Sequence, residues 1–152
     1  MKKLLLIFVF LSGYLFSQNT HVDVGIDEKL DQFLPSEAVF FDSDGKQITI
    51  ESLISKPTIL SLVYYECPGV CSPLLSELSH TIEKVDLEIG LDYQVITISF
   101  NDREDYKLAD KWKQIYLGGM KKRIDPKAWK FLTGDSINIR KITNAVGFYF
   151  KP

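Results

Sequence analysis

The stretch SLVYYECPGVCSPLL, residues 61–75, contains both cysteines of the chain, Cys67 and Cys71. Its first half belongs to an apolar, β-branched run that is typical of a buried strand. In its second half apolar residues begin to recur at helical spacing, and Pro73 falls in the first turn, where a missing N–H costs nothing. The stretch therefore predicts a strand, a tight turn and a helix, with the two thiols at the turn.

The rest of the chain continues this alternation of strands and helices. A β-hairpin is predicted around the turn sequence Asp42–Gly45. The further predicted elements are strands over 58–65, 93–100 and 129–133, helices over 72–86, 103–117 and 136–146, and a last strand that starts in GFYF. This order predicts an α/β sheet with parallel neighbours, and it places the cysteines at the carboxyl end of a strand, where such sheets hold their sites.

Composition indicates one soluble globular domain. The chain has 152 residues, of which 45% are apolar and 25% charged, as in ordinary single domains. The formal net charge of -2 gives no reason to expect nucleic acid or an anionic membrane surface as a partner.

The N-terminus predicts export. Lys2 and Lys3 precede a short apolar run that ends at Phe16, the pattern of a secretory signal. We expect residues 1–17 to be this signal, cut after Ser17; an uncleaved membrane anchor is the alternative. Residues 18–34 are then an N-terminal extension, and residues 35–152 form the domain.

Several roles are open to the two cysteines. A structural disulfide is a poor explanation, because it would close almost no loop. Two buried, inert cysteines remain possible, as does a redox pair. If the turn is helical, residues four apart bring their Cβ atoms to about 5–6 Å, and the helix N-terminus favours thiolate over thiol at both positions. Such a pair can hold one soft ion.

Copper is the ion that needs the fewest further ligands. Thiolates select Cu(I), zinc or iron–sulfur clusters, but closed zinc sites and clusters usually take four protein ligands. His80 lies nine residues after Cys71, on the other side of a continuous helix and about 13 Å along its axis. His21 lies in a polar segment with no visible anchor. Neither histidine is a credible third ligand.

Four motifs together resemble the SCO/SenC family of copper-binding, thioredoxin-like proteins. They are YYECPGVCSPLL, DYQVITISF, WKFLTGD and AVGFYF. The resemblance implies a thioredoxin-like fold with an N-terminal β-hairpin, and one copper ion held by Cys67 and Cys71. The third ligand of the family, a histidine, falls beyond Pro152, as do a strand pair and a closing helix. We therefore expect the sequence to be truncated at its C-terminus and the fold to be incomplete.

The loop after the second predicted strand departs from the family pattern. Asn101-Asp102 stands where family members commonly have Asp-Pro. Either Asp102 restores the carboxylate one residue later, or the loop SFNDRED is simply a solvated helix cap.

Two functions follow from the resemblance and the residues. The first is a copper metallochaperone for the copper centre of cytochrome c oxidase, whose partner is the copper-bearing oxidase subunit or another copper or thiol protein. The alternative is an extracytoplasmic thiol-disulfide oxidoreductase that acts on target cysteines, so whether the chain is an enzyme stays open. The C-x-x-x-C spacing favours metal over redox chemistry. We expect a periplasmic or membrane-tethered protein that is monomeric when complete.

Overall fold

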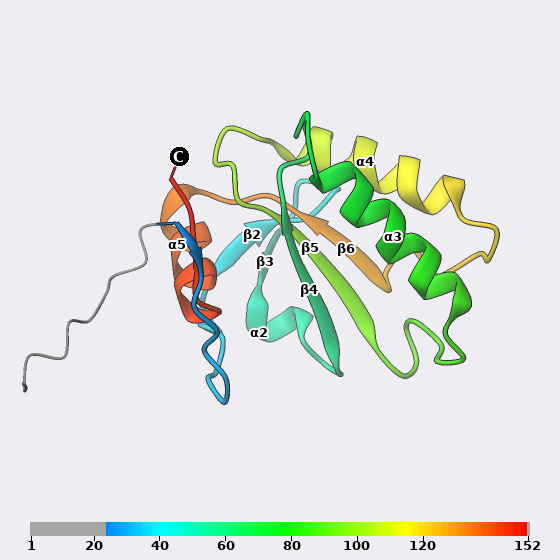
Figure 1. Ribbon diagram of the computed structural model, residues 1–152, viewed down its shortest axis with the longest axis horizontal. Helices are drawn as coiled ribbons and strands as arrows, with labels where there is room; N and C mark the ends of the chain where they lie inside the picture. Colours follow the sequence, from blue (N-terminus) through cyan, green and yellow to red (C-terminus); the bar gives the residue numbers. More distant parts are fainter. Residues whose placement is uncertain (1–23, 152) are drawn as a thin grey trace, which may run out of the picture.

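The computed structural model describes residues 24–151, so the predicted signal segment and His21 lie outside the described residues. The elements are β1 (Gly25–Ile26), β2 (Val39–Phe41), β3 (Gln47–Thr49), α2 (Ile50–Leu53), β4 (Thr58–Val63), α3 (Cys71–Lys84), β5 (Gln94–Ser99), α4 (Tyr106–Gly119), β6 (Trp129–Leu132), α5 (Ser136–Ala145) and β7 (Phe148–Tyr149). Figure 1 shows their arrangement. Within residues 24–151, no helix is both long and apolar enough to cross a membrane.

A parallel sheet in the order β4-β5-β6 forms the centre of the described chain. Thr58 is paired with Gln94 at the start of the first ladder, and Val95 with Trp129 at the start of the second. All three strands therefore end at the same edge, which carries the loops that follow them. The predicted α/β architecture with parallel neighbours is confirmed.

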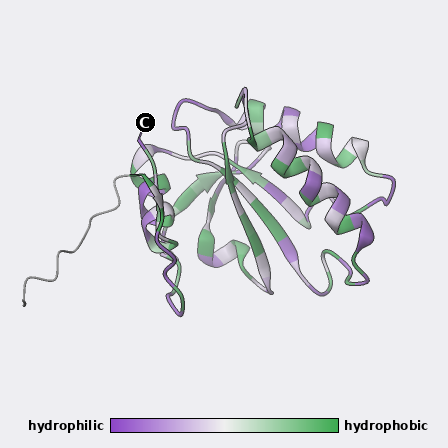
Figure 2. Ribbon diagram, viewed as in Figure 1, coloured by the Kyte–Doolittle hydropathy of each residue, from purple (hydrophilic) through white to green (hydrophobic). Residues whose placement is uncertain are grey.

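Each face of this sheet is covered by a separate apolar core. Helices α3 and α4 lie over one face, while the β2–β3 hairpin, α2 and α5 cover the other (Figure 1). Alternate residues of β5 supply the two cores, because successive side chains of a strand point to opposite faces: Val95 packs under α3 and α4, and Ile96 packs on the other side. Figure 2 shows hydrophobic residues along β4 and β5, and alternating hydrophobic and hydrophilic bands along α3 and α4.

A buried hydrogen-bond network crosses all three strands of the sheet. The hydroxyl of Thr97 on β5 accepts a hydrogen bond from Trp129 Nε1 on β6 at 2.9 Å and shares another with Ser61 Oγ on β4 at 2.7 Å. Thr97 and Trp129 are fully buried. Buried polar groups need such partners, so the network ties the strands together at one register.

Two antiparallel pairs flank the sheet. The predicted hairpin is confirmed as β2–β3, in which Val39 pairs with Thr49. The pairing of β1 with β7 was not predicted: Ile26 lies opposite Phe148, and the N–H of Asp27 donates to the carbonyl of Gly147 at 2.8 Å. Residues from both ends of the described chain therefore lie side by side (Figure 1).

Both predicted ends of the helix expected over residues 103–117 are wrong. The helix expected from Arg103 begins at Tyr106, because Asp105 adopts an extended conformation and its side chain caps the helix by accepting from the N–H of Leu108. The residues before Asp105 are therefore left in a loop at the carboxyl edge of the sheet. The helix also continues through Gly118 and Gly119, which were expected to close it.

Candidate functional site

The two cysteines lie where the prediction placed them, at the carboxyl end of β4. The strand ends at Val63, and Cys71 is the first residue of α3. The helix has no side-chain cap at Val70, so its first N–H groups stay directed toward the loop. On the neighbouring helix, Tyr116 donates a hydrogen bond to the carbonyl of Ser72 at 3.3 Å, which fixes the first turn of α3 against α4.

Both cysteines are free thiols, but their surroundings differ. Cys71 is 8% exposed, and its Sγ accepts a hydrogen bond from the N–H of Tyr64 at 3.4 Å. Cys67 is half-buried, and its Sγ accepts from the N–H of Gly69 at 3.4 Å. One sulfur is therefore anchored inside the domain, and the other can be reached from solvent.

The pKa values of the two thiols shift in opposite directions. Backbone N–H donors, that of Cys71 first and that of Gly69 second, lower the pKa of Cys67. Burial raises the pKa of the Cys71 thiol above its ordinary value. The expectation that the helix N-terminus favours thiolate at both positions is therefore wrong for Cys71, because loss of hydration there outweighs the donors.

A buried carboxylate that was not singled out in the sequence holds the cysteine loop. Glu104 is 9% exposed, and its two oxygens accept from the N–H groups of Tyr65 at 2.9 Å and Glu66 at 3.0 Å. The hydroxyl of Ser99 at the end of β5 donates to the same carboxylate at 2.5 Å. Three donors converge on Glu104, and two of them, Tyr65 and Glu66, directly precede Cys67 in the chain.

The loop that contains Asp102 provides the helix cap, one of the two roles considered for it from the sequence, because Asp105 caps α4. Asp102 itself is exposed. Asn101 closes the local turn by accepting from the N–H of Arg103 at 3.1 Å. The prediction that this loop lies on the same side as the cysteines is confirmed, but Glu104 is the residue that contacts the segment before Cys67. A buried acid in a run of charged residues leaves no periodic signal that would distinguish it.

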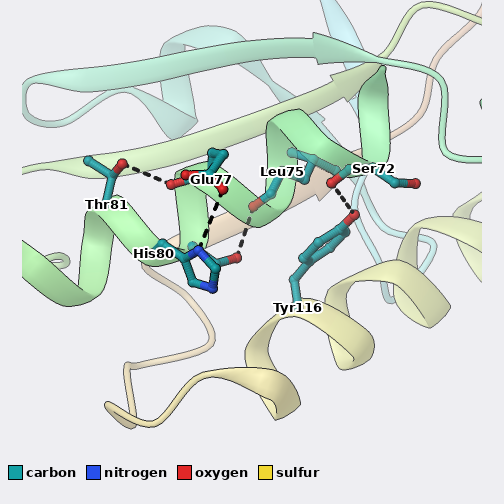
Figure 3. Close-up of polar contacts among 7 residues, drawn as sticks. Ser72, Leu75, Glu77, His80, Thr81 and Tyr116 are labelled. Carbon is teal, nitrogen blue, oxygen red and sulfur yellow. Dashed lines mark hydrogen bonds and ion pairs between the residues drawn. The ribbon is translucent and has the colours of Figure 1, made fainter. Parts of the chain in front are cut away.

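His80 lies on the exposed surface of α3, nine residues after Cys71. Its Nδ1 lies 3.7 Å from Glu77 Oε1, and its side chain is 60% exposed. Figure 3 shows His80 beside Glu77 on α3, further along the helix than Ser72. Within residues 24–151 no group of three or more His, Cys, Asp or Glu side chains is placed to hold a metal ion, so Cys67 and Cys71 are the candidate ligands in the described chain.

A pocket of about 650 Å³ opens beside this loop. It lies at the same edge of the sheet, and its wall includes Tyr64, whose N–H contacts Cys71. Its lining residues come from the ends of β4 and β5, from α5 and from the chain after β7: Tyr64, Phe100, Asn101, Asp102, Arg103, Ser136, Ile139, Arg140 and Phe150.

Comparison with known proteins assigns the family. The profile of the SCO1/SenC family matches residues 29–152. The SCO1 protein homolog of Bacillus subtilis is 26% identical over 97 residues, which are 64% of this chain and 47% of the relative. The chain thus spans less than half the length of the curated relatives it matches.

Solved structures agree with this assignment and with the predicted thioredoxin-like α/β fold. A protein from Aquifex aeolicus VF5 has a TM-score of 0.69 and 27% identity, covering 82% of this chain and 75% of its own. ScoI of Bradyrhizobium japonicum, solved with copper bound, has a TM-score of 0.54 and 26% identity, covering 75% and 67%. The extent of the family match, with its two cysteines at the strand–helix turn, shows that the chain belongs to the SCO1/SenC family.

Proposed function

We propose that this chain binds one copper ion through Cys67 and Cys71 and acts as a metallochaperone in the assembly of the copper centre of cytochrome c oxidase. The observation that carries the proposal is the pair of free thiols on one strand–helix turn in a SCO1/SenC protein. The copper-bound ScoI of Bradyrhizobium japonicum supports the choice of ion, and the Sco family includes oxidase assembly proteins.

The chemistry of the turn suits Cu(I). Thiolates are soft ligands, and Cu(I) accepts two or three of them. Each sulfur also receives a backbone N–H, from Tyr64 or from Gly69, and these donors stabilise negative charge on sulfur. The half-buried position of Cys67 leaves a side from which a ligand of a partner can approach, so copper can leave by ligand exchange.

The partner of this exchange is a copper-bearing oxidase subunit or another protein with copper ligands or thiols. We place the exchange outside the cytoplasm, in the periplasm or at the membrane surface, because residues 1–17 have the pattern of a secretory signal.

A second candidate function is thiol–disulfide exchange, which the unequal exposure of the thiols favours. Cys67 as thiolate attacks one sulfur of a target disulfide, and the other target sulfur leaves as thiolate. The buried Cys71 then attacks Cys67, which releases the second target thiol and leaves a Cys67–Cys71 disulfide. The target gains two electrons and the cysteine pair loses two.

Copper titration tests the first proposal. The full chain with reduced thiols is titrated with Cu(I) in competition with bicinchoninic acid, and we expect one tightly bound ion per chain. Cys67→Ser or Cys71→Ser should weaken binding at least a hundredfold, because each removes one soft ligand. His80→Ala is the matched control and should bind as the wild type does. Tight binding retained by the Cys67→Ser/Cys71→Ser double variant would reject the site.

Insulin reduction distinguishes the two functions. A chaperone should reduce insulin much more slowly than thioredoxin does under the same conditions, and bound copper should protect both thiols from alkylation. Turnover comparable with that of thioredoxin would favour the oxidoreductase.

A further inference from the structure

The buried carboxylate of Glu104 is not used by either proposed function, yet it contacts the segment from which the first cysteine projects. It lies in the loop between β5 and α4, and it accepts from Tyr65, Glu66 and Ser99. All three partners are uncharged donors. Hydrogen bonds to an ionised acceptor are roughly twice as strong as neutral ones, so this carboxylate holds its neighbours firmly.

The contacts begin where the sheet ends. The ladder between β4 and β5 ends with Val63 opposite Ser99. The N–H groups of the residues that follow β4 have no partner in the ladder. That of Tyr64 donates to Cys71 Sγ, and those of Tyr65 and Glu66 donate to Glu104. The carboxylate therefore provides the hydrogen-bond acceptors for two successive residues, as the carbonyl groups of a neighbouring strand would. Cys67 is the next residue.

We infer that Glu104 is a positioning residue that fixes the backbone of Tyr65 and Glu66, and thereby sets Cys67 in place relative to Cys71. The role in copper binding rests on the proposed function, but the placement of the two thiols does not. With this backbone fixed, the N–H of Tyr64 stays directed at Cys71 Sγ and the two sulfurs stay together before any ligand arrives. Such preorganisation raises affinity for the ion, because the loop is already ordered and binding does not have to reduce its conformational freedom.

The contacts require the full length and the charge of glutamate. An amide keeps the shape but replaces one acceptor oxygen with a donor, so a donor group would face the N–H of Tyr65 or of Glu66. An aspartate keeps the charge but is one methylene shorter, so it cannot reach both N–H groups from the same backbone position.

The experiment compares Glu104→Gln with the wild-type full chain by two measurements. The first is Cu(I) affinity by competition with bicinchoninic acid, for which we expect at least a tenfold loss. The second is the equilibrium of the metal-free dithiol with glutathione disulfide, which yields the Cys67–Cys71 disulfide and two glutathione molecules. We expect at least a threefold shift toward the dithiol, because a looser loop lowers the effective concentration of one thiol near the other.

Thr97→Val is the control for stability. It removes a buried hydroxyl from the middle of the sheet and should lower the melting temperature without changing either equilibrium more than twofold. Ser99→Ala removes one of the three donors to Glu104 and should give a smaller change than Glu104→Gln in the same direction, even if the latter variant folds poorly.

Glu104→Asp separates position from charge. We expect it to behave like Glu104→Gln, and wild-type values in Glu104→Asp beside altered values in Glu104→Gln would overturn the positioning role. Unchanged values in both variants would overturn it as well. If the wild-type chain binds no Cu(I), the proposed function fails, while the glutathione equilibrium still decides the role of Glu104.

Discussion

Replacing Thr97 with Val tests whether the buried network across the sheet stabilises the fold. The two side chains have nearly the same shape, so packing and strand preference change little. The substitution removes the oxygen that accepts from Trp129 Nε1 at 2.9 Å and pairs with Ser61 Oγ at 2.7 Å. Trp129 is fully buried and cannot turn to water, whereas Ser61 is 8% exposed.

The magnitude follows from the groups that lose their partner. A buried polar group left without a hydrogen bond costs about 1–3 kcal/mol, and two groups are affected, of which Ser61 recovers part of the loss. The added methyl group returns about 0.8 kcal/mol. We expect Thr97→Val to lower the free energy of unfolding by about 2–4 kcal/mol, or roughly 4 °C in melting temperature per kcal/mol.

Urea unfolding at equilibrium, followed by tryptophan fluorescence, measures this change. Thr143→Val is the matched control, because Thr143 is 1% exposed but donates only a long 3.4 Å hydrogen bond to a carbonyl of its own helix. It should cost less than about 1 kcal/mol. Ser61→Ala combined with Thr97→Val should cost less than the two single changes together, since they share one bond. A loss in Thr97→Val no larger than that in Thr143→Val would refute the reasoning.

Two further predictions concern the C-terminal part of the described chain. Asp135 caps α5 by accepting from the N–H of Asn138 at 2.8 Å, so Asp135→Ala should cost about 1 kcal/mol at pH 7 in urea unfolding. That hydrogen bond lowers the pKa of Asp135, so the stabilisation is complete above the unfolded-state pKa and is lost as pH falls through the lower folded-state value. The difference between the two proteins should therefore be full above about pH 4 and begin to shrink only below it. A constant difference down to pH 2 would contradict this. Gly147 has φ +70, and a Cβ there would lie 1.6 Å from the carbonyl oxygen of Asp27, so Gly147→Ala should detach β1 from β7 and speed trypsin cleavage after Lys29. Gly118→Ala, with open space around its Cβ, should leave that cleavage unchanged, and equal cleavage rates in the two variants would show that the β1–β7 pair does not protect this site.

The central part of the fold could be predicted because its signals are local and periodic. Strand β5 is rich in β-branched residues, and it is buried on both faces as a central parallel strand must be. Strand β7 was predicted from GFYF, but its partner β1 gave no such signal, because a two-residue strand is too short for a period. Their partner residues, such as Ile26 and Phe148, are also far apart in sequence.

The position of the two thiols could be predicted from the residues of the turn. Pro68 and Gly69 between the cysteines indicate a turn, and the turn places both thiols at the end of β4. The inequality of the thiols could not be foreseen, because burial of Cys71 depends on how α3 packs on the sheet. Glu104 was missed for a related reason: the helix was expected to begin at Arg103, and a glutamate in its first turn would face solvent.

A protein that receives copper and later gives it up must hold the ion firmly and still allow another ligand to reach it. One fixed ligand and one accessible ligand meet both needs. Cys71 is anchored by its position in the first turn of α3, by the hydrogen bond from Tyr64 and by burial, so its sulfur cannot follow a departing ion. Cys67 lies in the loop, half-exposed, and its backbone is held by Glu104 only up to the preceding residue. If copper transfer occurs as proposed, the bond to Cys67 is therefore the first to exchange, and the bond to Cys71 is broken only after the partner has supplied its own ligand.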